Sequence, residues 1–527
     1  MTYRLGIDVG GTNTDAVVLD EVDRPVAKAK SPTTPDVTSG IVRVLGKVLG
    51  QGLVDPRQVA YAMLGTTHCT NAIVERRRLT PVAIVRIGRP ATAAVQPLTG
   101  WPEDLASVCG RYVYLVRGGH EYDGREIAPL DEKEVARACR EVRGKVGSLA
   151  ICSVFSPVSS AHELRAAEIA REELGGVHIS LSHEIGSIGL LERENATVLN
   201  SAVSGVAGQV AAAFEQALRE RGIEARTYFG QNDGTLMAVD YAVRYPIFTV
   251  ACGPTNSIRG AAFLSGLRDA VVLDVGGTTT DVGVLANRFP RESSVAVEIG
   301  GVRTNFRMPD LISIGLGGGS IVRLGAGTGA GPGGRSGGGL TVGPDSVGYL
   351  LEEKAVVFGG DVLTATDVAV KLGLIDLGDP SRLSVLDRTT AQGAHARMVS
   401  MMEDALDRVK TSPQTVPVVA VGGGSILIPD RLAGASEVVR PQHFEVANAI
   451  GAAIAQVSGQ VERIFSLAGM GREEALEEAR RMARDEAVRA GADPATVEIV
   501  EVDDVPLAYL PGNATRIRVK AAGSLAG

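Results

Sequence analysis

The chain has 527 residues, of which 45% are hydrophobic and 22% are charged, which predicts a soluble globular protein with two or more domains. Its net charge of -8 and the absence of a clustered Lys/Arg segment argue against a nucleic-acid binder, because phosphate neutralisation needs a basic face. The five cysteines form no CxxC pair, no basic leader is seen, and no apolar run approaches the roughly 18 to 20 residues of a membrane span. We therefore expect a cytoplasmic protein without a membrane segment.

The first part of the chain alternates between strand-like and helix-like segments. Residues 3–30 are typical of three strands joined by two turns, and helical spacing follows at 39–53. Further strands and helices are expected in alternation at 61–67, 81–88, 148–156 and 161–175. Such alternation predicts an α/β fold.

The second part begins with a long helix. Residues 190–221 keep helical spacing over an unusual length, and Gly222 is a stop signal. A second α/β unit starts near 270 and contains a glycine-rich piece at 315–344, whose central block 325–339 is expected to be a mobile surface loop. The tail, a charged helix followed by two strands, is expected to form a small appended α/β subdomain.

One short motif occurs twice. GIDVGGTNTD spans 6–15 and LDVGGTTTD spans 273–281, so the aspartates Asp8 and Asp274 lie 266 positions apart, far more than a solenoid repeat. Each copy ends an apolar strand with an aspartate, turns at Gly-Gly-Thr and opens a second strand with Thr-Asp. A dinucleotide fingerprint needs GxGxxG before a helix and a P-loop needs GxxxxGK[ST], so the hairpin context excludes both.

This pattern favours a phosphate site. Paired glycines let backbone N–H groups converge on an anion, and threonine hydroxyls supply more donors. A carboxylate beside that anion needs a cation between them, so Asp8 and Asp274 are expected to face Mg²⁺ through water, and one of them could orient or deprotonate a nucleophile. The phosphate-contacting positions are expected to be Gly10, Gly11, Thr12, Thr14, Gly276, Gly277, Thr278 and Thr279. The plainer alternative is that each motif is only a hairpin turn.

A third glycine turn, VVAVGGGSILIP (418–429), completes a series that resembles the actin, sugar kinase and Hsp70 superfamily. Within it the chain resembles the hydantoinase A/5-oxoprolinase family. The matching stretches are GIDVGGTNTDAVV, LGTTHCTNAIVER, GLLERENATVLNSAV, CGPTNSIRGA, DVGGTTTDVGV and ISIGLGGGSI.

The resemblance implies two ribonuclease H-like domains flanking an ATP cleft, with Gly422, Gly423, Gly424 and Ser425 against the adenosine. It implies the boundaries 1–185, 186–270, 271–465 and 466–527 for the first half, a helical linker with a cleft-lining loop, the second half and a C-terminal appendage. The implied activity is ATP-dependent opening of a hydantoin, 5-oxoproline or other lactam by phosphorylation of the amide oxygen. A companion B-type subunit and a homo- or hetero-oligomer are also implied.

Two other activities share these phosphate motifs. A small-molecule kinase would release a stable phosphorylated product, and an ATP-driven activator would change its domain angle to act on a partner protein. The motifs report ATP use and do not identify the acceptor.

Several polar positions are weaker candidates. Thr66, Thr67 and Asn71 stand at a strand-to-helix junction, where they either cap the helix or meet the substrate. Gly318 and Gly319 are candidates for substrate or phosphate contact. His68 and Cys69 are better explained as structural residues, and Cys252 as packing within a Gly-Pro loop that lines the cleft.

The histidines show no local metal-ligand spacing such as HExxH, which makes a protein-bound transition metal improbable. His120, Glu121, Asp123 and Glu126 are expected to form a solvated turn.

Overall fold

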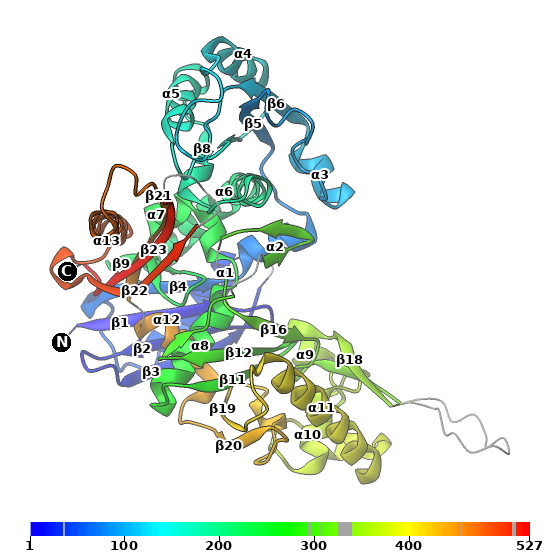
Figure 1. Cartoon of the computed structure of the whole chain (residues 1–527). Helices are drawn as coiled ribbons and strands as arrows, with labels where there is room; N and C mark the ends of the chain where they lie inside the picture. The colour runs from blue at the N-terminus through cyan, green and yellow to red at the C-terminus, as the bar shows by residue number, and fades with distance from the viewer. Residues whose placement is uncertain are drawn as a thin grey trace.

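A computed structural model gives the architecture of the protein as an α/β fold built on several sheets (Figure 1). The structure describes residues 2–34, 37–293, 297–306, 308–324, 340–454, 456–507 and 513–526. The predicted glycine-rich loop at 325–339 lies outside these residues.

The largest sheet contains the first repeated motif. Within the described residues its strands lie in the order β22-β23-β21-β10-β9-β4-β1-β2-β3. Their bounds are β1 (Tyr3–Val9), β2 (Asn13–Leu19), β3 (Pro25–Pro32), β4 (Val59–Thr66), β9 (Arg226–Gly230), β10 (Leu236–Ala238), β21 (Val457–Phe465), β22 (Glu498–Pro506) and β23 (Thr515–Gly523). Strands β1, β4 and β9 run parallel, whereas β2 and β3 are antiparallel to their neighbours.

A second sheet contains the second motif. Its described strands lie in the order β13-β12-β11-β19-β20, and β16 also pairs with β12. Their bounds are β11 (Ala270–Val275), β12 (Thr280–Ala286), β13 (Phe289–Pro290), β16 (Leu311–Ile314), β19 (Val416–Val421) and β20 (Ala435–Val439). Helices α10 (Ala365–Leu372) and α11 (Arg388–Val409) cover it through a core that includes Val368 and Met402.

The two sheets share one strand order. In both, an antiparallel hairpin is followed by strands parallel to its first strand, so the spatial order is third, second, first, fourth, fifth. This shared topology confirms the expected pair of ribonuclease H-like halves.

A further sheet is inserted in the first half. Strands β5 (Val82–Arg89), β6 (Tyr112–Arg117), β7 (Ser148–Ser153) and β8 (His178–Leu181) are all parallel, with helices α3 (Glu103–Cys109), α4 (Glu132–Val142) and α5 (Ala161–Leu174) among them. In Figure 1 this unit lies at the top, with the second half at the opposite end. The predicted strands at 81–88 and 148–156 therefore exist, but they do not join the sheet of the first motif.

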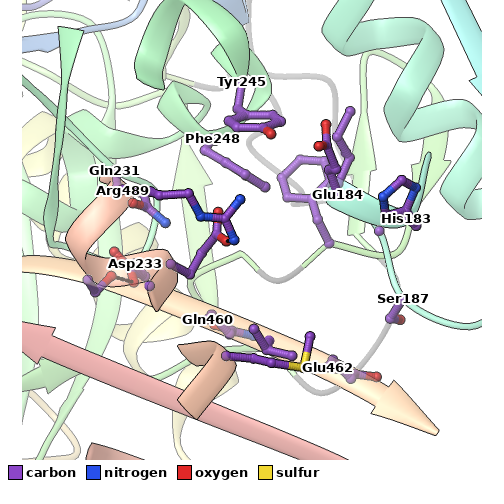
Figure 2. Close-up of a pocket in the computed structure, with 18 of the residues that line it drawn as sticks. His183, Glu184, Ser187, Gln231, Asp233, Tyr245, Phe248, Gln460, Glu462 and Arg489 are labelled. Carbon is purple, nitrogen blue, oxygen red and sulfur yellow. Dashed lines mark hydrogen bonds and ion pairs between the residues drawn. The ribbon is translucent and has the colours of Figure 1, made fainter. Parts of the chain in front are cut away.

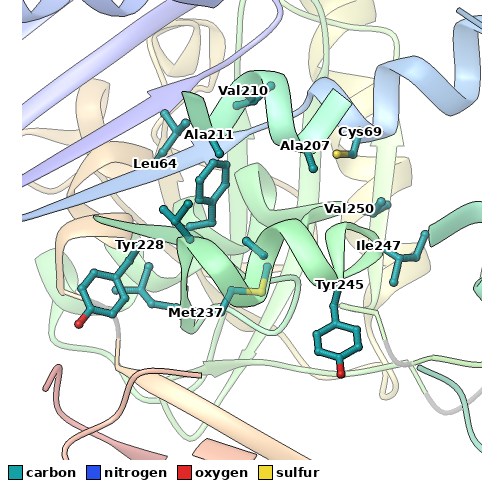
Figure 3. Close-up of a cluster of buried hydrophobic side chains, with 14 of the residues drawn as sticks. Leu64, Cys69, Ala207, Val210, Ala211, Tyr228, Met237, Tyr245, Ile247 and Val250 are labelled. Atoms are coloured by element: carbon teal, nitrogen blue, oxygen red, sulfur yellow. The ribbon is translucent and has the colours of Figure 1, made fainter. Parts of the chain in front are cut away.

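The long predicted helix is α6 (Leu190–Glu220), and it packs between these parts of the first half. Figure 3 shows side chains of α6, including Ala207, Val210 and Ala211, directed at residues of the large sheet and its neighbours. By length and composition this helix could cross a membrane, since its most apolar window has a mean hydropathy of 1.2, but 72% of that window is buried inside the fold. In this fold α6 is a core helix. From the sequence we expected no segment apolar enough to span a membrane, and α6 comes closer to one than that.

The C-terminal tail differs from the expected separate subdomain. Strands β22 and β23 pair with each other, β23 pairs with β21, and β21 pairs with β10, so the tail extends the large sheet. Helix α13 (Arg472–Arg489) covers this extension through an alanine face on β21 and β23. The two termini therefore lie on the same side of the molecule (Figure 1).

Two helices lie between the halves. Helix α12 (Ala447–Ile454) packs on β2 of the first sheet, and α8 (Cys252–Ser265) packs on the second sheet. Their backbones come very close, because a Cβ on Gly451 would lie 1.8 Å from the Asn256 carbonyl oxygen and one on Gly260 would lie 1.9 Å from that of Ala447. Glycine is required at both crossing points.

The remaining helices are short or peripheral. Their bounds are α1 (Val37–Leu49), α2 (His68–Glu75), α7 (Val239–Arg244) and α9 (Leu351–Lys354), and the small hairpins are β14 (Val297–Ile299) with β15 (Val302–Thr304) and β17 (Ser320–Arg323) with β18 (Thr341–Ser346).

Candidate functional site

The two repeated motifs form matching hairpins. In the first, Asp8 pairs with Asp15 across β1 and β2, and the Gly10 N–H donates to the Asn13 carbonyl at 3.0 Å. In the second, Asp274 pairs with Asp281 across β11 and β12, and the Gly276 N–H donates to Thr279 at 2.9 Å. The sequence repeat is thus a structural repeat down to the turn hydrogen bond.

These hairpins touch each other at their tips. The hydroxyls of Thr12 and Thr278 are 3.0 Å apart, and a Cβ on Gly277 would lie 2.5 Å from the Thr12 side chain. Two sets of turn amides and hydroxyls therefore meet at one place, where together they can surround an anion. Gly11 and Thr279 are exposed there, while the fully buried Thr14 hydroxyl lies 3.3 Å from that of Thr33, beneath the turn.

Four aspartates stand behind the hairpin tips. Burial, together with the negative charge of Asp15, raises the pKa of Asp8 to about 7. Burial also raises the pKa of Asp274, and it raises that of Asp281 to about 6 despite a hydrogen bond from Ser313. The Lys30 ammonium lies 2.9 Å from Asp15. Because carboxyl groups outnumber this cation, a divalent cation would relieve their repulsion, and the donor set suits Mg²⁺.

Neighbouring polar side chains hold these carboxylates. The Asn448 amide of α12 donates to Asp8 at 2.9 Å and to Asp15 at 3.0 Å. On α8 the Asn256 amide donates to Asp8 at 3.4 Å, and the Ser257 hydroxyl donates to Asp274 at 2.5 Å. The two crossing helices therefore orient the carboxylates of both halves.

The third glycine turn packs beside the second hairpin. Gly422 has a φ of +82°, and a Cβ there would lie 2.2 Å from an Asp274 carboxylate oxygen. The Gly424 N–H donates to the Val275 carbonyl at 2.7 Å, and Ser425 is fully buried. Gly423 is exposed, so this turn offers one open backbone position close to the paired carboxylates.

The turn at 317–320 packs against the second hairpin. Gly318 and Gly319 donate their N–H groups to the carbonyls of Gly276 and Gly277 at 3.0 and 2.7 Å. These hydrogen bonds hold the second hairpin in place, and contact of Gly318 or Gly319 with a substrate stays a prediction.

The strand-to-helix junction after β4 lies next to the first hairpin. Thr66 is level with Val9 in the β1–β4 register, and the Thr67 hydroxyl donates to the Val9 carbonyl at 3.4 Å. The Asn71 amide donates to the Thr67 hydroxyl at 3.4 Å. These residues fix the end of β1, so any substrate contact by them remains a prediction.

Cys69 and Cys252 are buried, and His68 is half-buried beside them. The Thr66 hydroxyl lies 2.6 Å from the His68 ring, and burial lowers the pKa of His68 to about 4. Burial raises the pKa of Cys69 to about 11 and that of Cys252 to about 12, which keeps both thiols protonated. The stretch CGPTNS is the first turn of α8 and not the expected loop.

Sequence reasoning missed the residues that support the aspartates. Asp15 and Asp281 occupy equivalent places in the repeat, so the repeat itself contained their signal. Asn256 and Ser257 lie within a motif that was attributed to cleft lining, and Lys30 and Asn448 had no local signal.

The cluster around His120 differs from the expected solvated turn. His120 and His162 are buried, their rings lie 4.3 Å apart, and with the exposed Glu126 they form a His-His-Glu group. The Gly119 N–H donates to Nδ1 of His162, which places the ring proton on Nε2, 3.1 Å from Glu126. A metal would have to displace that proton, so this geometry disfavours one.

Comparison with known proteins places the chain in one family. Two ribonuclease H-like halves with facing Gly-Gly-Thr hairpins define the class of fold. Residues 4–174 match the hydantoinase/oxoprolinase N-terminal region, and residues 193–384 match hydantoinase/oxoprolinase. The chain belongs to the hydantoinase/oxoprolinase family.

Several known proteins are similar to it. It is 26% identical to caprolactamase subunit alpha of Pseudomonas jessenii over 88% of this chain and 67% of that one. It is 28% identical to the acetophenone carboxylase gamma subunit of Aromatoleum aromaticum over 71% and 53% of the two chains. The crystal structure of the ATP-dependent caprolactamase of P. jessenii shares the fold, with a TM-score of 0.76 at 20% identity over 98% of this chain and 87% of that one. The chain thus spans about half to two thirds of these curated relatives.

Proposed function

We propose that this protein uses ATP to phosphorylate the amide oxygen of a cyclic amide, as the activating subunit of an amidohydrolase. The observation that supports this most directly is the contact between the two hairpins, with Thr12 and Thr278 hydroxyls 3.0 Å apart and carboxylates behind them. A triphosphate between the tips would meet amides from both halves. The relationship to a caprolactamase subunit supports a cyclic amide as acceptor.

The chemistry explains why ATP is needed. Resonance makes an amide carbonyl a poor electrophile and its nitrogen a poor leaving group. Transfer of the γ-phosphoryl group from ATP to the amide oxygen releases ADP and leaves an electrophilic carbon. Water then adds to that carbon, and the ring C–N bond breaks as the nitrogen takes up a proton, which leaves an acyl phosphate. A second water hydrolyses the acyl phosphate to the ring-opened acid and phosphate. We assign the hydrolytic half to a companion subunit.

We assign the contacts with the phosphates, the adenosine and Mg²⁺ to different groups of residues. The turns Gly10–Thr12 and Gly276–Thr278 would hold the phosphates, and Gly422, Gly423 and Gly424 would lie against the adenosine. Asp8 and Asp274 would hold Mg²⁺ through water, which supplies positive charge beside the phosphates. With its pKa near 7, Asp8 could also accept a proton at neutral pH.

A second acceptor is favoured by one specific finding. The match to an acetophenone carboxylase gamma subunit supports ATP-dependent activation of a ketone or carboxylate oxygen, which needs the same phosphate site. The two candidates differ in the product that forms.

Assays with the companion subunit separate these candidates. The protein, copurified with its companion, is incubated with Mg-ATP and hydantoin, caprolactam or 5-oxoproline, or with a ketone and bicarbonate. A ring-opened amino acid formed together with phosphate supports the amidase, and a carboxylated ketone supports the second candidate. A stable phosphate ester would instead identify a kinase.

Asp274→Asn tests the site itself. The substitution keeps the shape and removes the charge, so we expect ATP turnover to fall at least about 100-fold while the circular dichroism spectrum is unchanged. Asp269→Asn, an exposed aspartate just before β11, serves as the matched control and should keep wild-type turnover. Wild-type ATP consumption by Asp274→Asn would exclude this assignment.

A further inference from the structure

One lysine stands in line with the two carboxylates of the first hairpin. In the strand register, Asp8 of β1 is opposite Asp15 of β2, and Asp15 is opposite Lys30 of β3. Residues that lie directly opposite each other in antiparallel strands project from the same face of the sheet. Asp8, Asp15 and Lys30 therefore form one row across the first hairpin and the strand beside it.

The second hairpin has the same row with one difference. Asp274 is opposite Asp281, and Asp281 is opposite Ser313 of β16, whose hydroxyl donates to the Asp281 carboxylate. A neutral hydroxyl thus takes the place in the second row that a cation takes in the first. Because the two rows otherwise repeat each other, the architecture of the hairpins does not by itself explain the lysine.

The backbone of Lys30 is fixed, whereas its ammonium group is not. The Lys30 carbonyl accepts a hydrogen bond from the Lys47 ammonium at 3.0 Å, and further along the chain the Thr33 N–H donates to the Thr12 carbonyl at 2.9 Å. The Lys30 ammonium lies 2.9 Å from Oδ1 of the buried Asp15, yet within the described residues that oxygen accepts no hydrogen bond. The N–H groups of the ammonium are therefore available to a ligand, and 34% of the side chain is exposed.

The ammonium group also reaches the second half of the molecule. A Cβ on Gly423, the exposed position of the third glycine turn, would lie 3.7 Å from Nζ of Lys30. Burial raises the pKa of Asp274, and the hydrogen bond from Ser257 and the positive charge of Lys30 both lower it. Lys30 thus lies between the hairpin carboxylates and the third glycine turn, two places that the phosphates of ATP link in the proposed function.

We propose that Lys30 binds the phosphate chain of ATP directly, as a cation that the first half supplies in addition to the turn amides. An ammonium on a flexible side chain can turn from Asp15 to a phosphate oxygen, and a hydrogen bond between two charged groups is stronger than one between neutral groups. The Asn448 amide also donates to Asp15 at 3.0 Å, so this carboxylate keeps a partner when the ammonium turns away. The inference rests on the proposed use of ATP, and it adds a phosphate contact outside the three glycine turns.

Nucleotide binding by the full chain tests this contact without an acceptor or a companion subunit. Isothermal titration is carried out with Mg-ATP, Mg-ADP and adenosine. We expect Lys30→Met to weaken ATP and ADP binding about 10- to 100-fold, as the loss of one hydrogen bond between charged groups implies, and to leave adenosine binding unchanged. Lys30→Arg keeps the charge and should lose less. Equal ATP binding by the wild type and Lys30→Met, or an equal loss for ATP and adenosine, would overturn the proposal.

A double variant separates contact with phosphate from neutralisation of Asp15. Lys30→Met alone leaves the buried Asp15 without its cation, which can disturb the fold. Lys30→Met is therefore also made in the Asp15→Asn background, where that charge is absent. We expect the double variant to keep a wild-type circular dichroism spectrum and to bind ATP at least about tenfold more weakly than Asp15→Asn. Equal ATP affinity of these two variants would assign Lys30 a purely structural role and overturn the proposal.

Two other cations serve as matched controls. Lys28 lies two residues before Lys30 on the same face of β3 and pairs with Glu445, so Lys28→Met removes an equal charge from the same strand. Arg463 is a half-buried cation that forms no ion pair within the described residues, and it lines a cavity of about 340 Å³ to which neither hairpin contributes (Figure 2). Lys28→Met and Arg463→Met should bind ATP like the wild type. A loss in either control as large as that in Lys30→Met would contradict a direct contact.

The proposed function and this inference have separate outcomes. If Lys30→Met weakens ATP binding but no cyclic amide is opened when the companion subunit is present, the proposed function fails alone. If the wild type opens the ring and Lys30→Met binds ATP equally well, the assignment of Lys30 fails alone. Absence of ATP binding by the wild type would overturn both.

Discussion

At the scale of single residues, the hairpin carboxylates are held in an environment that opposes their own ionisation. Asp8 is 4% exposed and lies near Asp15 and Asp274, which keeps its pKa near 7. Asn448 and Asn256 offset part of this by donating hydrogen bonds to its charged form. Raised carboxyl pKa values of this kind are typical of functional sites.

The stability of the protein should therefore depend on Asp8 and pH. The folded pKa of Asp8 is raised from 3.8 to about 7, so the unfolded state binds fewer protons between these values and stability falls as pH rises through them. The gap corresponds to at most about 4 kcal/mol. We expect Asp8→Asn to raise the melting temperature at pH 8 and to change it little at pH 4. Scanning calorimetry at both pH values measures this, and an equal effect at both would contradict it.

Asn448 should tune the same carboxyl group. Asn448→Ala removes a hydrogen bond to ionised Asp8, so the pKa of Asp8 should rise and the acid limb of the kcat/KM profile should move to higher pH. A pH-rate profile of ATP turnover checks this prediction. The activity should recover at pH 9, whereas a uniform loss at every pH would indicate a purely structural role.

At the scale of elements, the crossing of α8 and α12 sets the relation of the two halves. These helices pack against different sheets, and each provides a side chain that donates a hydrogen bond to one of the hairpin carboxylates. Gly260 and Gly451 let them approach until backbone touches backbone. Small changes in this crossing should therefore reach both hairpins.

Gly451→Ala tests the crossing. The new Cβ would lie 1.8 Å from the Asn256 carbonyl oxygen, so the helices must separate, at a cost of roughly 1–3 kcal/mol or more. We expect lower stability in urea and weaker ATP binding, because Asn448 and Asn256 move apart. The matched variant is Gly208→Ala on α6, where a Cβ meets no atom within 4 Å, and it should be neutral or stabilising. Similar behaviour of the two variants would contradict this account.

At the scale of the whole molecule, two halves built on the same strand order meet at their repeated hairpins, and the C-terminal strands extend the first sheet. The inserted four-stranded sheet lies at the far end from the second half (Figure 1). A nucleotide between the hairpins would join the halves and should stabilise the molecule as a unit.

Mg-ATP should raise the melting temperature of the protein. A ligand that binds only the folded state adds about 2.7 kcal/mol at one hundred times its Kd. Differential scanning fluorimetry should show a smaller shift for ATP in EDTA, because the carboxylates behind the tips then repel the phosphates. An equal shift with and without Mg²⁺ would exclude a role for the cation in nucleotide binding.

The sequence by itself determined the α/β class, the long helix at 190–221 and the two Asp-Gly-Gly-Thr hairpins, because apolar periodicity and turn residues are local signals. It also carried Asp15 and Asp281 within the repeat. Only the tertiary structure decided that the tail extends the first sheet and that the Gly318 and Gly319 N–H groups donate to the second hairpin. It also decided that Lys30 and Asn448 contact the aspartates. These contacts join residues up to 440 positions apart, and strand pairing and helix crossing leave no mark in the local pattern of either partner.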